Sequence, residues 1–263
     1  MKSFLLLLLL IPMAAVPALA QPRLIDIDGA AVLVNTIGTD SREAGQPLII
    51  LESGHGTPMG HWDRILAGLA ELGPVLAYDR PGIGGSEPDA EMPTARHVAD
   101  KLLRILDELE LGPPYLLVGH SLGGAYVRGF AGFYPEWVAG LVIIDPADFT
   151  ETQENKRLYY DVLGWDEARI DEQIAADLRV RTERAVEAPA SIREESEVLE
   201  AMRDDDFREI LDYPLPNVPV HILAGGRFDL PERFRSPEYD QEALFRSKLR
   251  HRLGRWLEVV QSV

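Results

Sequence analysis

Short, largely apolar segments alternate along the chain with longer segments whose apolar residues recur at helical spacing. A segment that is apolar at nearly every position is typical of a strand buried on both faces, as in parallel sheets. Five such segments occur, at residues 47–51, 74–78, 115–118, 139–144 and 218–223. Their alternation with amphipathic helices predicts an α/β fold with a mostly parallel central sheet flanked by helices.

Local patterns predict the remaining elements. Residues 24–27 and 31–37 flank an Asp28-Gly29 turn and predict a β-hairpin. Residues 124–133 follow the strand at 115–118 and predict a helix directly after it. Apolar residues at helical spacing predict three further helices, around residues 62–69, 98–109 and 244–260.

Residues 147–213 differ in composition from the rest of the chain. They are rich in Glu, Asp and Arg, contain no strand-like run and are expected to form several helices. Such a segment is either an ordinary surface insertion or a lid, since long insertions in open α/β sheets usually lie at the ligand end of the strands. We favour a helical lid.

The first 20 residues have the pattern of a cleaved secretion signal. Lys2 precedes an unbroken apolar run at residues 4–11, and Ala18-Leu19-Ala20 offers the small residues that signal peptidase reads. The run is shorter than the roughly 20 residues needed to span a bilayer. We therefore expect a signal peptide at 1–20, one domain at 21–263, a secreted or periplasmic location and no membrane attachment after cleavage.

Charge and cysteine content exclude several classes of function. The chain has 43 acidic and 26 basic residues, a formal net charge of −17, and no cysteine. So acidic a surface repels nucleic-acid backbones and anionic lipids, and the absence of cysteine excludes disulfides and thiolate chemistry. The expected partner is a small-molecule substrate. No oligomeric state is indicated.

One glycine-rich turn carries the clearest chemical signal. Gly119-His120-Ser121-Leu122-Gly123 matches the pattern G-x-S-x-G and lies between a predicted strand and a predicted helix. A serine at such a turn takes a strained backbone conformation, and side chains at the flanking glycines would clash with neighbouring backbone. The helix that follows directs its first amides toward a developing oxyanion. Ser121 is therefore the candidate nucleophile.

Four motifs in this order make the chain similar to the α/β-hydrolase fold family from about residue 24 to its C-terminus. They are the Ser121 turn and residues 52–56 with Trp62 downstream, 78–86 and 224–229. The resemblance implies a serine hydrolase that cleaves an ester or amide bond through an acyl-enzyme on Ser121. It also implies an oxyanion hole formed by the backbone N–H groups of His55 and Leu122.

The same resemblance implies roles for the acidic residues. The triad acid should follow the strand after the insertion, where Asp229 lies. Asp145, at the end of the strand before the insertion, is the competing candidate, although it is better suited to closing that strand. Asp79 and Arg80 resemble a turn whose charged residues brace a loop.

The expected order of a triad is serine, acid, then histidine in a loop after a final strand. Of the six histidines, only His251 follows Asp229, and it lies within the helical pattern at 244–260. His251 is therefore a provisional base. The pattern favours a last strand, histidine loop and closing helix that this sequence does not contain, which would leave the triad histidine absent.

Two alternatives to an active hydrolase follow. The first is a catalytically impaired hydrolase fold that acts as a binding module or exists as a fragment. The second is a dinucleotide oxidoreductase, suggested by Gly54-His55-Gly56 after a strand, but the third glycine is one place late and Pro58 interrupts the turn. Phosphate-loop, zinc-helix and EF-hand patterns are absent from the sequence, so we expect no cofactor and no metal.

Overall fold

Seven strands form a single sheet in the computed structural model, which describes residues 21–147 and 153–261. The strand order is β1-β2-β4-β3-β5-β6-β7. Strands β3 to β7 are parallel, whereas the hairpin β1–β2 adds two antiparallel strands at one edge. The strands are β1 (Arg23–Ile27), β2 (Ala30–Ile37), β3 (Leu48–Glu52), β4 (Val75–Tyr78), β5 (Tyr115–His120), β6 (Val138–Ile144) and β7 (Val220–Leu223).

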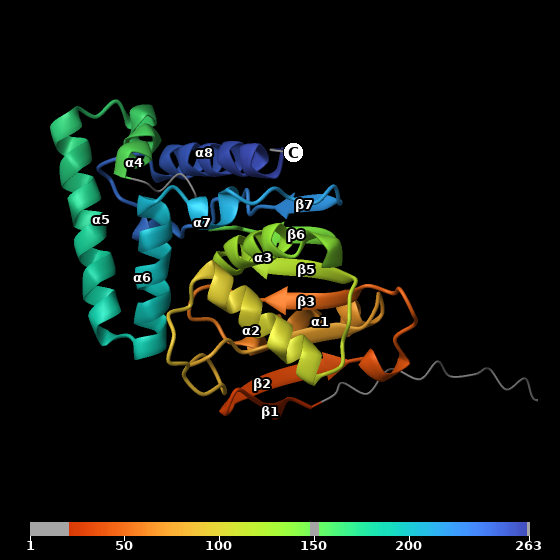
Figure 1. The fold of residues 1–263 in the computed structure, drawn as a ribbon. Helices are drawn as coiled ribbons and strands as arrows, with labels where there is room; N and C mark the ends of the chain where they lie inside the picture. Colours follow the sequence, from red (N-terminus) through yellow and green to blue (C-terminus); the bar gives the residue numbers. More distant parts are fainter. Residues whose placement is uncertain (1–20, 148–152, 262–263) are drawn as a thin grey trace, which may run out of the picture.

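Helices cover both faces of this sheet (Figure 1). The main helices are α1 (Asp63–Ala70), α2 (Ala95–Glu108), α3 (Leu122–Phe133) and α8 (Gln241–Gln261). Short 3₁₀ helices are η1 (Thr39–Ser41), η2 (Met59–Trp62), η3 (Pro135–Trp137), η4 (Asp161–Leu163) and η5 (Glu232–Phe234). The predicted strands and helices agree with these bounds to within a few residues, so the mostly parallel α/β architecture is confirmed.

Two apolar clusters on opposite faces of the sheet hold these layers together. The larger contains the buried residues of α2 and α3, including Leu102, Ile105 and Phe130, packed against strands β3 to β6. The smaller contains Trp62 of η2 and Leu66 of α1, packed against β3 and β4. The central strands are buried along almost their whole length, which explains their uniformly apolar sequences.

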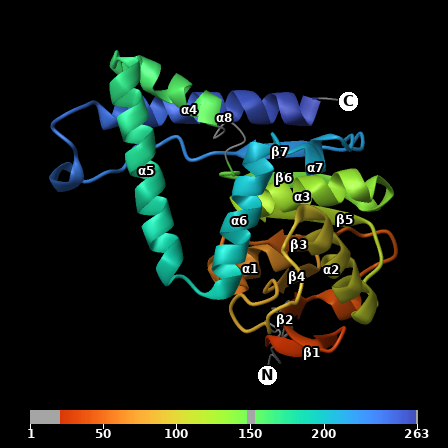
Figure 2. The ribbon, with the colours of Figure 1, turned by 60° about the vertical axis from the view of Figure 1, so that its left-hand side comes forward.

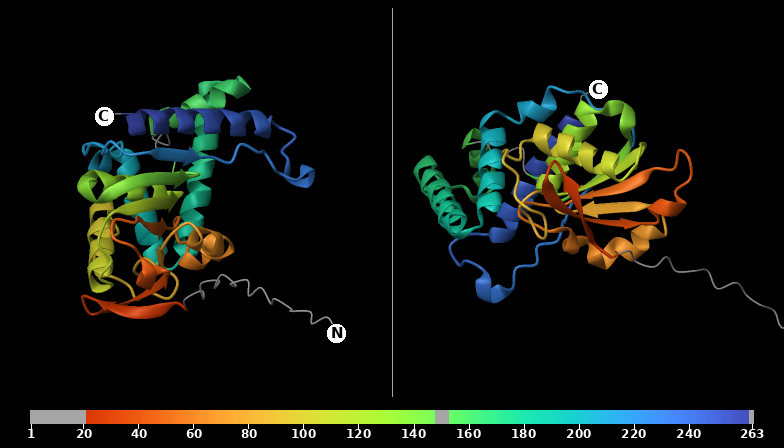
Figure 3. Two further views of the ribbon diagram at one scale, coloured as in Figure 1. Left: turned by 90° about the vertical axis from the view of Figure 1, so that its right-hand side faces the viewer. Right: turned by 60° about the horizontal axis from the view of Figure 1, so that its bottom comes forward.

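The segment between β6 and β7 contains helices and no strand where the structure describes it, as predicted. It contains α4 (Gln153–Tyr160), α5 (Glu167–Glu187), α6 (Ala190–Asp204) and α7 (Arg208–Leu211). Helices α5 and α6 stand beside the sheet at one end of the strands (Figures 2 and 3). Tyr159, Tyr160, Ile170 and Leu244 form a separate small core that joins α4 and α5 to α8.

Some expectations fall on residues that are not described. The predicted signal peptide, residues 1–20, lies outside the described residues, as does the start of the insertion at 148–152. Within the described ranges, no helix combines the length and the apolar composition needed to cross a membrane.

Candidate active site

Ser121 occupies a sharp turn between β5 and α3, at the carboxyl edge of the sheet. Its φ is 53° and its ψ is −118°, in a region that residues with a side chain rarely adopt. A Cβ on Gly119 would lie 2.4 Å from the carbonyl oxygen of Gly123, and a Cβ on Gly123 would lie 2.3 Å from that of Glu52. Only glycine fits at these two positions, so the sequence pattern has the steric origin that was predicted for it.

The residues predicted to form the oxyanion hole lie around this turn. Leu122 is the first residue of α3, and an N–H at that position has no acceptor within its own helix. The loop after β3 approaches from the other side, because a Cβ on Gly54 would lie 3.2 Å from Cβ of Ser121. Within the described residues, neither the N–H of His55 nor that of Leu122 donates a hydrogen bond. Both amides are therefore available to a substrate oxygen.

The loop of residues 53–56, called the oxyanion loop below, is held in place by the buried Arg80. The Arg80 guanidinium donates to the carbonyl oxygens of Ser53 and Gly54, each at 2.7 Å. It also donates to Glu52 Oε1 at 2.6 Å. Trp62 Nε1 adds a bond to Ser53 Oγ at 2.9 Å. Together, these contacts restrain residues 52–54, which immediately precede the His55 amide.

A second carboxylate reaches Arg80 from the helical insertion. Glu195 on α6 accepts from Arg80 Nε through Oε1 at 2.7 Å and from the N–H of Gly56 through Oε2 at 2.7 Å. Arg80, Glu52 and Glu195 are all 2–3% exposed. Although burial alone lowers the pKa of Arg80, the charges of Glu52 and Glu195 raise it above its usual value. Arg80 therefore remains a buried cation between two acids.

Glu52 itself is a costly residue to bury. Desolvation raises the pKa of the Glu52 carboxyl, and the Arg80 charge and a hydrogen bond from the Tyr78 hydroxyl offset part of that effect. Asp79 has the bracing role expected of it, since it accepts the N–H groups of Met59 at 2.6 Å and Gly85 at 2.8 Å. The charged turn after β4 thus supports the active-site loops without touching Ser121.

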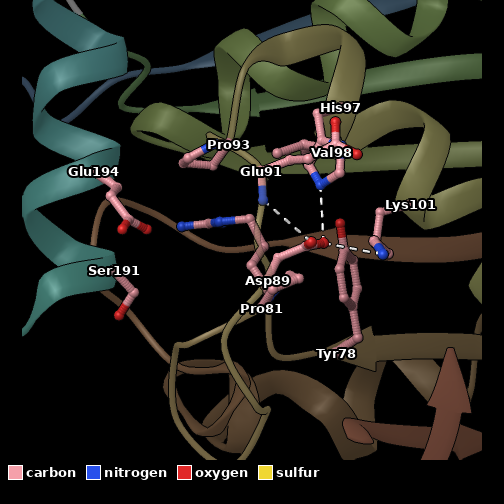
Figure 4. A pocket seen from close by; sticks show the side chains of 11 residues that line it. Tyr78, Pro81, Asp89, Glu91, Pro93, His97, Val98, Lys101, Ser191 and Glu194 are labelled. Carbon is pink, nitrogen blue, oxygen red and sulfur yellow. Dashed lines mark hydrogen bonds and ion pairs between the residues drawn. The ribbon is translucent and has the colours of Figure 1, made fainter. Parts of the chain in front are cut away.

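A small cavity lies beside this cluster, between α6 and the loop after β4. Its volume is about 20 Å³, which is enough for one water molecule. Figure 4 shows Ser191 and Glu194 of α6 on one side, and Asp89 held by His97 and Lys101 on the other. Ser191 Oγ also donates to the carbonyl oxygen of Gly82, so α6 is hydrogen-bonded to this loop.

Two histidines, His120 and His61, lie next to the Ser121 turn without a hydrogen bond to its hydroxyl. The His120 ring stacks on His61, with a centroid distance of 5.2 Å and an interplanar angle of 22°. Burial and the neighbouring His61 lower the pKa of His120, and the Asp145 charge opposes this shift. Within the described residues, no side chain forms a hydrogen bond with the hydroxyl of Ser121.

The two candidate acids have different surroundings. Asp229 follows β7 and is 76% exposed, with Arg227 as an ion-pair partner at 3.6 Å. Asp145, at the end of β6, accepts the N–H of Gly225 at 2.8 Å and a bond from Arg252 at 3.2 Å. Of the two acids, it is Asp145, the competing candidate, whose negative charge affects the Ser121 turn, because it opposes the lowering of the His120 pKa.

His251 lies on α8, away from the other predicted residues. Its ring packs against Tyr159 at a centroid distance of 5.8 Å, and it lines an open groove with Leu158 and Arg255. No contact joins it to Ser121 or Asp229 in the part of the chain that the structure describes. The structure thus brings together Ser121, Leu122 and His55, but neither Asp229 nor His251 with them.

Sequence reasoning did not identify Glu52 or Glu195 as part of this site. A signal for Glu52 was present, because a carboxylate that ends an apolar strand must find a cation. Glu195 gave no such signal, since it is one of many acids in a charged segment. Among the described residues, no group of three or more His, Cys, Asp or Glu side chains is arranged to hold a metal ion.

Comparisons with known proteins agree with this geometry. The family model described as alpha/beta hydrolase family matches residues 49–257. The dihydrolipoyllysine-residue acetyltransferase component of the acetoin cleaving system of Pseudomonas putida is 29% identical over 196 residues, covering 70% of this chain and 52% of that protein. The chain spans about half, or less, of the length of the curated relatives it matches.

Solved structures show the same fold. The epoxide hydrolase CorEH superposes with a TM-score of 0.54 at 19% identity, covering 78% of this chain and 82% of that one. The enol-lactonase from Burkholderia xenovorans LB400 superposes with a TM-score of 0.52 at 18% identity, covering 77% and 81%. With its strained serine turn, its sheet order and a family match over most of its length, the chain belongs to the alpha/beta hydrolase family.

Proposed function

We propose that the protein is a serine hydrolase that cleaves an ester or amide bond of a small molecule through an acyl-enzyme on Ser121. The observation that carries the proposal is the Ser121 turn, where a strained, partly exposed serine lies near two amides that have no acceptor among the residues described. A serine at this position distinguishes the chain from hydrolase-fold proteins that form an ester on an aspartate there, such as epoxide hydrolases.

The proposed reaction has two halves. Ser121 Oγ bonds to the substrate carbonyl carbon while its proton passes to a base, and the carbonyl oxygen becomes an oxyanion bound by the N–H groups of His55 and Leu122. Collapse of this intermediate expels the alcohol or amine, which takes the proton. Water then adds to the acyl-enzyme, a carboxylic acid leaves, and Ser121 regains its hydrogen.

The substrate class follows from the charge and from the insertion. With a formal net charge of −17, the protein repels anionic molecules, so we propose a neutral or cationic substrate. We propose further that helices α5 and α6 act as a lid over the carboxyl edge of the sheet, and that the protein is exported by its first 20 residues. No cofactor takes part in the proposed reaction.

Labelling with a fluorophosphonate probe tests the proposal, because such a probe bonds to an activated serine and releases fluoride. We expect one probe per chain, located on Ser121 by peptide mass spectrometry, and no labelling of Ser121→Ala. The exposed Ser41→Ala serves as the matched control and should label like the native protein. Labelling that persists in Ser121→Ala would refute the assignment.

A second prediction concerns the base. Since His251 packs against Tyr159 and away from Ser121, we expect His251→Ala to change the labelling rate by less than about twofold. Free imidazole should accelerate labelling by about tenfold, less than the roughly 10²- to 10⁴-fold of a positioned base. Stopped-flow or gel-based rates measure both effects. A loss of about 100-fold in His251→Ala would instead identify His251 as the base.

A second candidate function is a hydrolase-fold binding protein. The absence of any histidine contact to the Ser121 hydroxyl among the described residues favours it, because loss of a triad histidine costs about 10⁶-fold in turnover in a serine protease. In that case the native protein would remain unlabelled, with or without imidazole. It would still bind neutral esters, which equilibrium dialysis would detect.

A further inference from the structure

Helix α6 meets the rest of the protein through two chemically different halves. Towards its C-terminus, Val198 and Met202 are buried in the main apolar cluster. Its first turns instead make polar contacts with the loops at the carboxyl edge of the sheet. Ser191 Oγ donates to the carbonyl of Gly82 at 2.6 Å, and Ser196 Oγ lies 2.8 Å from His55 Nε2. The end of α6 that reaches the active site is thus held by hydrogen bonds.

Glu195 is the only one of these polar groups, among those the structure describes, that also contacts Arg80. Its two oxygens bind two different parts of the site, Arg80 Nε and the N–H of Gly56. Arg80 in turn holds the carbonyl oxygen of Gly54 at 2.7 Å. Hydrogen bonds therefore hold the oxyanion loop on both sides of His55, at Gly54 and at Gly56. The Glu195 carboxylate takes part in both, because it accepts from Arg80 and from the N–H of Gly56.

The hydrogen bond from Arg80 to Gly54 bears on catalysis because of the geometry of the peptide bond. The carbonyl of Gly54 and the N–H of His55 belong to one planar trans peptide unit and point in opposite directions. When Arg80 fixes the direction of the Gly54 oxygen, it also fixes the direction of the His55 N–H. Arg80 lies between two carboxylates, Glu52 and Glu195, so its own position depends on both ion pairs.

We propose that Glu195 is a positioning residue that couples the docking of α6 to the orientation of the His55 oxyanion donor. With α6 docked, Glu195 holds Arg80 and Gly56, and the His55 amide faces the nucleophile. With α6 displaced, Arg80 retains only Glu52 as an ionic partner and the loop loses its bond at Gly56. The proposal rests on the proposed function, since it assigns Glu195 to the oxyanion hole of that reaction.

The coupling can be measured without catalysis, by amide hydrogen exchange. The N–H of Thr57 donates to the carbonyl of Gly54 at 3.2 Å, so its exchange reports on the loop at an atom that Glu195 does not touch. In Glu195→Gln we expect exchange at Thr57 to accelerate by about tenfold relative to that of the core amide of Leu117. Glu197→Gln, the same change at an exposed position two residues away, should leave both rates unchanged.

The consequence for chemistry is measured by fluorophosphonate kinetics. Glu195→Gln should lower the rate constant of phosphonylation by about tenfold, less than the roughly 10²- to 10³-fold expected for loss of a whole donor. The dissociation constant of a small probe should stay within about twofold. A role in folding alone would reduce the fraction of protein that reacts, but would not slow the reaction of the rest.

These measurements separate the two proposals. If the native protein does not react at Ser121, the proposed function fails, whereas Thr57 exchange still decides whether Glu195 orders the loop. If the native protein reacts and Glu195→Gln reacts at the same rate, the coupling alone is refuted. Equal acceleration of exchange at Thr57 and Leu117 would also refute it, because the effect would then be global destabilisation.

Discussion

Arg80→Ala is expected to lower the free energy of unfolding by about 3–5 kcal/mol and the melting temperature by roughly 10 °C. The guanidinium is 3% exposed and compensates two buried carboxylates, Glu52 and Glu195. Its removal leaves both acids without a cationic partner and takes away one donor from each of two backbone carbonyls. Urea denaturation of the native protein and the variant, followed by circular dichroism, measures the difference.

The loss of stability in Arg80→Ala should depend on pH, in a direction that follows from Glu52. Burial raises the pKa of Glu52 in the folded protein, so the folded state binds that proton more tightly than the unfolded state. Such a group contributes stability below its unfolded pKa, and this contribution is lost as the pH rises through the folded pKa. With the Arg80 charge removed, the deficit of the variant should be smallest below about pH 4.5 and should grow above it.

The matched control is an arginine that lies at the surface. Arg104 pairs with Asp28, but its side chain is 59% exposed and water replaces the lost partner. Arg104→Ala should therefore unfold close to the native protein at every pH. An Arg80→Ala protein that also unfolds like the native one would show that the buried cluster contributes little to stability, and a deficit independent of pH would exclude Glu52 as its cause.

The sheet and the strained Ser121 turn were predictable from sequence because both depend on local chemistry. The central parallel strands β3, β4 and β5 are recognisable as runs of apolar residues, since both of their faces are covered. The Ser121 turn is equally local, because the glycines that its strain requires lie two residues to either side.

The supporting cluster was not predictable because it joins residues that are far apart in the sequence. Arg80 and Glu195 are separated by 115 positions, and their contact depends on how α6 is placed relative to the sheet. The sequence could not settle the roles of Asp229 and His251 for the same reason, since each depends on where the segments after β7 pack. Sequence alone assigned Arg80 to loop bracing, but it gave no means of choosing Glu195 among the acids of the insertion.

Gly123→Ala is expected to abolish labelling of Ser121 and to lower the free energy of unfolding by about 1–3 kcal/mol or more. The added methyl would lie 2.3 Å from the carbonyl oxygen of Glu52 and 2.6 Å from that of Ser53. Both are backbone atoms at the end of β3, so no side chain can rotate to make room. Relief requires α3 to move away from the oxyanion loop, which separates the Leu122 and His55 amides.

Gly68→Ala is the matched control, because it adds the same methyl group at a position where there is space for it. Gly68 lies within α1, and no atom would come within 4 Å of its added Cβ. Because alanine favours a helix over glycine, this variant should be more stable than the native protein by up to about 1 kcal/mol and should label at the native rate. If Gly123→Ala also kept native stability and reactivity, α3 and β3 would not be in close contact. The steric basis for assigning Ser121 as the nucleophile would then be lost.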